Sequence, residues 1–218
     1  KFDFYEQILM YEWTKLSNFQ SSIRGGVSTQ AALNNLRIGL KPPQSGKQNP
    51  HYFDDGAMSR AVPIGAMCVG QPETAARLAE MDAAVTNSED GVWAAQAMAV
   101  AISLVCYGKS INESINEAYK YLPESSWIRR TVDEAMSLVE KSDSVFSILP
   151  EIQNKIVNRE YSYGNVAPET LALTFIIAKL HGSDFEKAIA SAACFAKSGE
   201  TLPAMVGALV GAMQSKSF

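Results

Sequence analysis

The sequence predicts an all-α protein built as a multi-helix bundle. No stretch alternates apolar and polar residues over the length of a strand, whereas apolar residues recur at helical spacing along most of the chain. Two turns of small and polar residues, 54–56 and 86–91, each lead into a long alanine-rich segment. Polar residues at helix starts leave free N–H groups in front of them. We therefore expect ten or eleven helices with a polar pocket at one end.

Composition narrows the class of protein. The 218 residues suit one large domain and no linker divides them, so we expect a single domain over 1–218. Apolar residues make up 47% of the chain, enough for a sizeable core, and the net charge of −4 argues against a nucleic-acid partner. No apolar run approaches the ~20 residues of a membrane-spanning helix, and we expect no signal peptide. We therefore expect no membrane partner and a cytoplasmic location.

The cysteines and histidines give no sign of metal or triad chemistry. Cys68, Cys106 and Cys194 lie in apolar helical contexts, which favours buried free thiols over a disulfide or a metal site. The spacing of Cys and His residues fits no zinc site, and the chain has no glycine-rich phosphate loop and no Gly-x-Ser-x-Gly elbow. His51 and His181 lie in poor contexts for a Ser-His triad.

The first part of the chain predicts two helices and a loop. Residues 3–16 space apolar side chains as a helix does, and Ser28 is the expected N-cap of a helix that ends near residue 36. Residues 41–50 contain three prolines and one glycine and predict a long polar loop. Such a loop is either functional or mobile, or a plain surface connection, and both interpretations stay open here.

The turn Asp54-Asp55-Gly56 opens the next helical segment. Paired acids ahead of a helix interact favourably with its positive end. They serve either as helix caps alone or as contacts to a ligand, and Arg60 is expected to pair with Asp54 or Asp55. Pro72 begins a helix to about residue 85, in which Asp82 is expected to make a structural hydrogen bond.

The remaining helices follow from apolar spacing and end signals. Gly108 should end the helix that spans 90–107, and Ser125 or Ser126 should cap a later helix. His181 is expected to act as a C-terminal charge or cap. The turn 161–165 carries two aromatic residues, of which Tyr163 stacks either on a ligand base or on its own loop. The expected ranges are 112–121, 125–141, 145–157, 167–180 and 183–197.

Four motifs in this order resemble the ADP-ribosylglycohydrolase family, all-α enzymes that cut ADP-ribose from modified proteins or small molecules. An Asp-Gly-x-Met-Ser-Arg turn spans 55–60, and Thr86-Asn87 stands where the family has Thr-His. Residues 198–203 stand where the family has Gly-Gly-Asp-Thr-Asp-Thr, and a Gly-Ala-x-x-Gly-Ala helix follows at 207–212. The resemblance covers most of residues 50–213.

The resemblance implies an orthogonal helix bundle and a glycohydrolase that cleaves a bond to an ADP-ribose-type ligand, either a small molecule or attached to a protein. Its pocket is expected between the turns 54–56, 86–88 and 199–201. The implied catalytic residues are Asp54, Asp55 and Glu200. The implied ligand contacts are Gly56, Met58, Thr86, Asn87, Ser88, Tyr163, Gly199 and Thr201.

The family uses one or two Mg²⁺ ions, held by carboxylates. In the family run Gly-Gly-Asp-Thr-Asp-Thr, Glu200 takes the position of the first aspartate and Leu202 the position of the second. Because leucine cannot bind a metal ion, the resemblance implies one ion rather than two, held by Glu200 and Asp55. An equal alternative is that Glu200 belongs to a simple helix start.

Three functions remain open at this point: a glycohydrolase of the family type, an inactive relative that binds a ligand or serves a structural role, and a hydrolase for another glycosyl substrate. Asn87 cannot titrate, which excludes a proton transfer by histidine at this position. Family members usually carry a further N-terminal segment with acidic residues, and no acidic cluster precedes residue 50, so we expect the domain to be incomplete at its N-terminus. The oligomeric state stays open.

Overall fold

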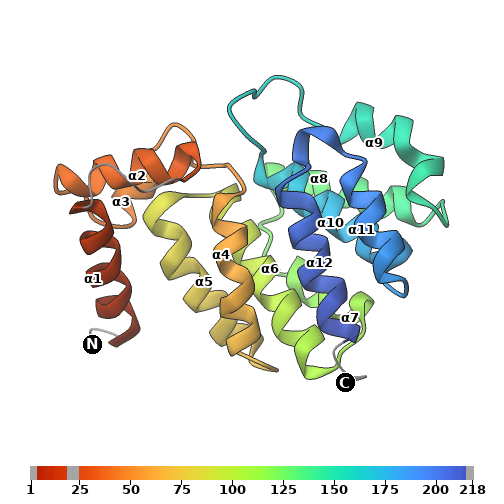
Figure 1. Ribbon diagram of the computed structural model, residues 1–218, viewed down its shortest axis with the longest axis horizontal. Coiled ribbons are helices and arrows are strands. Elements are labelled where there is room, and N and C mark those ends of the chain that lie inside the picture. Colours follow the sequence, from red (N-terminus) through yellow and green to blue (C-terminus); the bar gives the residue numbers. More distant parts are fainter. Residues whose placement is uncertain (1–3, 19–24, 215–218) are drawn as a thin grey trace.

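The structure is a computed structural model that describes residues 4–18 and 25–214. Within these residues the chain forms twelve α-helices, two short 3-10 helices and no strand beyond an isolated bridge between Asp54 and Val166 (Figure 1). The predicted all-α fold is confirmed. The helices are α1 (Phe4–Asn18), α2 (Val27–Arg37), α3 (Gln44–Lys47), α4 (Gly56–Met67), α5 (Pro72–Thr86), α6 (Asp90–Tyr107), α7 (Ile111–Tyr119), α8 (Trp127–Val139), η1 (Val145–Ile148), α9 (Leu149–Lys155), α10 (Ala167–His181), α11 (Phe185–Ala193), η2 (Ala196–Ser198) and α12 (Thr201–Gln214).

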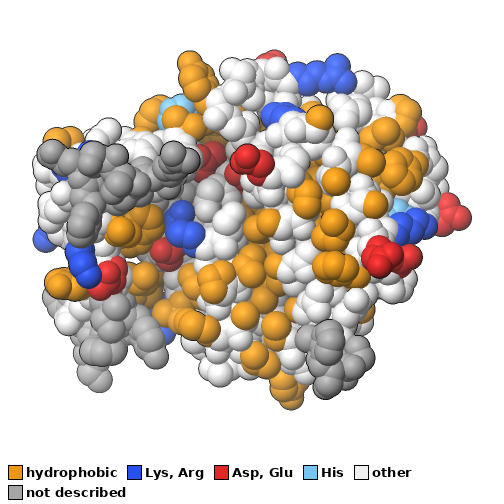
Figure 2. All heavy atoms as spheres, viewed as in Figure 1, with side chains coloured by type: hydrophobic (Ala, Val, Ile, Leu, Met, Phe, Trp, Pro, Cys, Tyr) orange, Lys and Arg blue, Asp and Glu red, His pale blue; other side chains and the backbone are white. Residues whose placement is uncertain are grey.

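Helix α6 forms the centre of the fold. It packs against α4, α5, α7, α8, α10 and α12, and it is buried along most of its length. Its length and composition would allow it to span a membrane, but it is a largely buried core helix in this structure. Helices α1, α2 and α3 lie together at one end and pack on α5 (Figure 1). Hydrophobic side chains also appear on the face formed by α4 and α12 (Figure 2).

Local signals explain most helix ends. Gly108 ends α6 with a left-handed backbone (φ 106°), and the Ser126 side chain accepts the Arg129 N–H to cap α8. Asp184 caps α11 in the same way. The predicted Ser28 cap is wrong, because α2 begins after Gly26 and Ser28 lies inside it. Residue 3, where the first helix was expected to begin, lies outside the described residues.

Three other expectations need correction. Residues 41–50 contain the short helix α3, whose Gly46 packs against the backbone carbonyls of Ala84 and Asn87, so this segment is anchored on α5. His181 is buried, and its Nε2 accepts the Val145 N–H at 3.4 Å; burial lowers its pKa, so it is not a charged cap. All three thiols are free, but Cys194 is exposed because it follows the last turn of α11 on the solvent side.

Gly65 permits the close contact between α4 and α6. A Cβ atom at this position would lie 2.5 Å from the Ala99 carbonyl oxygen and 2.8 Å from the Ile102 Cβ. We predict that Gly65→Ala destabilises the protein by about 1–3 kcal/mol through overpacking, despite the better helix propensity of alanine. Urea denaturation measures the effect. Gly26→Ala is the matched control, because a Cβ there meets nothing within 4 Å; equal midpoints for the two variants would contradict the close approach.

Candidate active site

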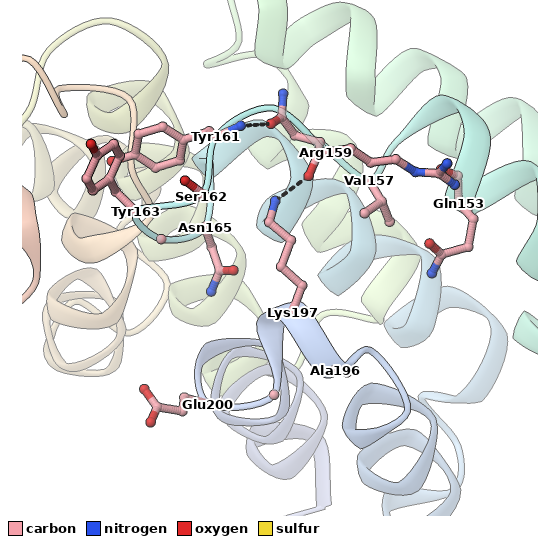
Figure 3. A pocket seen from close by; sticks show the side chains of 13 residues that line it. Gln153, Val157, Arg159, Tyr161, Ser162, Tyr163, Asn165, Ala196, Lys197 and Glu200 are labelled. Carbon is pink, nitrogen blue, oxygen red and sulfur yellow. Dashed lines mark hydrogen bonds between the residues drawn. The ribbon is translucent and has the colours of Figure 1, made fainter.

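A pocket of about 760 Å³ lies between the segment 153–165 and the segment 196–200 (Figure 3). Tyr161, Tyr163 and Asn165 line it from the turn before α10, and Gly199 and Glu200 line it from the start of α12. Of the three turns expected around the pocket, 199–201 therefore contributes directly. Neither the turn 54–56 nor the turn 86–88 lines the pocket, so Asp54, Asp55 and Gly56 lie outside its lining, whereas the aromatic turn 161–165 forms part of it.

A buried carboxylate, Glu169, joins the two walls of this pocket. It is 1% exposed and accepts the Asn158 N–H at 2.8 Å, the Lys197 Nζ at 2.6 Å and the Ser198 hydroxyl at 3.3 Å. Lys197 Nζ also donates to the Asn158 carbonyl oxygen at 2.7 Å, as Figure 3 shows. Sequence reasoning missed this link, although a glutamate in the first turn of an otherwise apolar helix was a visible signal.

Asp54 holds the acidic turn in place. Its Oδ1 accepts the Gly56 N–H and the Asn87 amide, each at 3.0 Å, and its Oδ2 accepts the Ser28 N–H at 3.3 Å. These bonds attach the start of α4 to α2 and to the end of α5. Both carboxylate oxygens are therefore engaged in structural bonds, which supports the capping interpretation of Asp54.

Asn87 is the centre of a buried polar network. Its amide nitrogen donates to the Tyr52 carbonyl, the Asp54 carbonyl and Asp54 Oδ1, and its oxygen accepts the Thr86 hydroxyl at 2.6 Å. Arg60 continues the network, because its Nη2 donates to Thr86 Oγ1 at 2.7 Å. Each polar group of the Asn87 side chain thus has a protein partner.

Arg60 pairs with Asp82 instead of the acidic turn. The Arg60 Nε lies 2.7 Å from Asp82 Oδ2, and Trp13 Nε1 donates to Asp82 Oδ1 at 3.1 Å. The expected pairing with Asp54 or Asp55 is wrong, because α4 and α5 lie side by side and bring Asp82 to the guanidinium. The expected structural hydrogen bond of Asp82 is confirmed, and it fastens α1 to α5.

Asp55 has different hydrogen-bond partners from Asp54, and its pKa is raised. It is 8% exposed, its Oδ2 accepts the Thr170 hydroxyl at 2.7 Å, and its N–H donates to the Asn165 carbonyl at 3.3 Å. Burial raises its pKa from 3.8 to about 6; the bonds from Thr170 and Asn165 lower it, and the charge of Asp54 adds to the rise. A carboxyl group that titrates near neutral pH lies against Asn165, which lines the pocket.

The remaining predicted ligand contacts divide into two groups. Tyr163, Gly199 and Glu200 line the pocket, Thr201 follows them at the start of α12, and Gly56 and Ser88 are half-buried in their turns. Met58, Thr86 and Asn87 are at most 1% exposed. Ligand contacts by these three side chains do not fit the structure, because Met58 faces the core from α4 and the other two are engaged in the buried network.

The donor set for Mg²⁺ is small. The described residues contain no group of three or more His, Cys, Asp or Glu side chains arranged to hold a metal ion. Both carboxylate oxygens of Asp54 accept hydrogen bonds from the protein, and Asp55 accepts one from Thr170. These two residues therefore leave few free oxygen atoms to coordinate a metal ion. The ion expected between Asp55 and Glu200 stays a prediction, and no reaction step below passes through a metal.

The raised pKa of Asp55 has a consequence for stability. The folded protein keeps this proton up to a pH of about 6, whereas the unfolded chain releases it near 3.8, so the group favours folding at low pH and loses that contribution as the pH rises through 6. We predict that Asp55→Asn stabilises the protein by roughly 3 kcal/mol at about pH 8, a gain that disappears near pH 4. Urea denaturation at both pH values tests this, with the exposed Glu124→Gln as control. A gain independent of pH would refute the explanation.

Comparison with known proteins identifies the family of this chain. The model of the ADP-ribosylglycohydrolase family matches residues 3–215. A comparison with curated proteins found no match. Because the family model covers nearly the whole sequence and the fold is all-α, the chain belongs to the ADP-ribosylglycohydrolase family.

Proposed function

We propose that this protein is a glycohydrolase that cleaves the bond between an ADP-ribosyl group and its leaving group. Membership of the family indicates a hydrolase of this type. The observation that carries the finer proposal is Asp55, a buried carboxyl group whose pKa is raised to about 6 beside a residue that lines the pocket. A pKa near the working pH is what general acid–base catalysis requires.

The pocket offers complementary groups for each part of an ADP-ribosyl ligand. Tyr163 is 71% exposed, so one face of its ring is available to a base, although its contacts with His51 and Tyr161 fit stacking within its own loop as well. Arg159 lines the pocket with an exposed guanidinium, which suits a diphosphate. The ribosyl carbon would then lie toward Asn165, Asp55 and Glu200.

The carboxylates of Asp55 and Glu200 take different parts in the proposed reaction. Ionised Asp55 accepts a proton from water, the water oxygen forms a bond to C1 of the ribose, and the bond from C1 to the leaving group breaks. The leaving group takes a proton from solvent, and free ADP-ribose is the other product. Glu200 is exposed at the pocket, and its negative charge stabilises the positive charge that develops on the sugar in the transition state of such reactions.

A second candidate is a relative that binds ADP-ribose-type ligands without cleaving them. The observation that favours it is the engagement of Asp54 and Asn87, which stand at chemical positions of the family but serve structural bonds here. A hydrolase for another glycosyl substrate is the third candidate, favoured by the same changes.

Location and partners are part of the proposal. The three free thiols support a reducing compartment, so we propose a cytoplasmic protein. The net charge of −4 supports the absence of a nucleic-acid partner, and the burial of α6 supports the absence of a membrane partner. The exposed rim of the pocket suits a small molecule as well as a protein-attached ligand. The oligomeric state stays open.

We predict that the protein releases ADP-ribose from at least one ADP-ribosylated amino acid, with kcat/KM rising as the pH passes through about 6. Asp55→Asn should lower kcat by roughly 10²- to 10⁴-fold and remove this dependence on pH. Chromatographic release of ADP-ribose from arginine-, serine- and glutamate-linked substrates measures it, with Glu124→Gln as control. Full activity of Asp55→Asn would refute the assignment, whereas ADP-ribose binding without release would favour the second candidate.

The single Mg²⁺ ion expected at Asp55 and Glu200 predicts tighter ADP-ribose binding in Mg²⁺ than in EDTA, whereas the few free carboxylate oxygens among the described residues predict equal binding in the two buffers. Calorimetry of ADP-ribose binding in both buffers tests this, and Glu200→Ala is the informative variant. Binding at least tenfold tighter in Mg²⁺ than in EDTA, with this gain abolished by Glu200→Ala, would instead support the single ion expected from the sequence.

A further inference from the structure

A histidine and a tyrosine meet at the edge of the pocket. His51 Nδ1 lies 2.6 Å from the Tyr161 hydroxyl, within hydrogen-bond distance, and the two residues are 110 positions apart in the sequence. The Tyr161 ring also packs edge-on against Phe53, with ring centroids 5.0 Å apart. Tyr161 lines the pocket (Figure 3), and His51, which does not line it, contacts this wall through the Tyr161 hydroxyl.

Both partners are held by the rest of the site. The backbone N–H of His51 donates to Asn49 Oδ1 at 2.9 Å, and its carbonyl accepts the Asp54 N–H at 3.1 Å. Asn49 is 2% exposed, and its amide donates to the Ser28 and Thr86 carbonyls. His51 is therefore fixed to the acidic turn.

Tyr161 is fixed to the segment that carries Asn158. Its backbone N–H donates to Asn158 Oδ1 at 2.8 Å, and Asn158 belongs to the Glu169 link between the pocket walls. The bond between His51 and Tyr161 thus connects the segment that leads into the acidic turn to the aromatic turn at the pocket.

The environment keeps the Tyr161 phenol neutral. Burial first, and then the charges of Asp54 and Asp55, raise its pKa to about 12. A neutral phenol has one O–H donor and two acceptor lone pairs. Its proton needs an acceptor, and His51 Nδ1 lies at the right distance for this when the imidazole carries its own proton on Nε2.

We propose that His51 and Tyr161 act as one hydrogen-bonded pair that receives a ribose hydroxyl of the ligand beside Asp55: His51 Nδ1 accepts the phenol proton, and the Tyr161 oxygen accepts the sugar hydroxyl. The assignment rests on the proposed function and adds a specificity for the sugar to it. Because the phenol donates to His51, its free capacity in the pocket is as an acceptor, which selects a donor such as a hydroxyl group. His51 is a positioning residue in this arrangement.

The test combines a binding experiment with a measurement that does not depend on function. Nitrogen-15 NMR of the full chain should show the His51 proton on Nε2, with a changed signal in Tyr161→Phe. In calorimetry, Tyr161→Phe and His51→Leu should each weaken ADP-ribose binding by roughly tenfold, and the double variant should bind no more weakly than either, since both remove the same unit.

Two further variants separate positioning from general damage. His51→Asn retains an acceptor near the Nδ1 position and should bind ADP-ribose within about twofold of the native protein. Tyr119→Phe, which removes a phenol hydroxyl bonded to Asp133 away from the pocket, should not weaken binding. Retained binding in Tyr161→Phe, or a His51 proton on Nδ1, would overturn the pair. A native protein that binds no ADP-ribose would overturn the sugar contact and the proposed function together, while the NMR result still decides the pairing itself.

Discussion

The site depends on the bonds that Asn87 makes at the junction of α5 and α6. Asn87 joins the carbonyls of Tyr52 and Asp54 and the Asp54 carboxylate to the end of α5, in a place that water does not reach. If the side chain were shortened, the Tyr52 carbonyl would keep the Ser88 N–H and the Asp54 carboxylate would keep the Gly56 and Ser28 N–H groups, whereas the Asp54 carbonyl would lose its bond to Asn87. A buried polar group left unpaired costs about 1–3 kcal/mol. Asn87 therefore fixes the position of the acidic turn, and with it the direction of Asp55.

The two acids of this turn show how adjacent carboxylates acquire different roles. Asp54 accepts three hydrogen bonds from nitrogen donors and serves as a clamp. Asp55 is as deeply buried but has fewer compensating bonds, so its charged form is disfavoured. The same group that makes the protein less stable at neutral pH is the one suited to proton transfer, and strained or poorly compensated groups of this kind gather at functional sites.

Local signals in the sequence were sufficient for several helix ends, because Pro72, Gly108 and Ser126 act within one turn of their own positions. They failed where a partner distant in the sequence decides. Ser28 looks like a cap, yet its N–H bonds to Asp54, and Arg60 meets Asp82 because two helices lie side by side. The acidic turn and Glu200 were found through the family motifs, and Tyr163 was found through its turn of two aromatic residues. Glu169 and His51 were missed, since their partners Lys197 and Tyr161 are 28 and 110 residues away.

The ion pair between Glu169 and Lys197 makes the effect of a substitution at one of these positions depend on the residue at the other. Loss of the lysine would leave the buried Glu169 carboxylate without its cation, and loss of the glutamate would leave the Asn158 N–H without this acceptor and the lysine with the Asn158 carbonyl. Breaking one side of a buried ion pair typically costs about 3–5 kcal/mol, a large part of the stability of a small domain. A substitution at position 169 or 197 alone is therefore expected to lower stability more than a paired change that removes both charges.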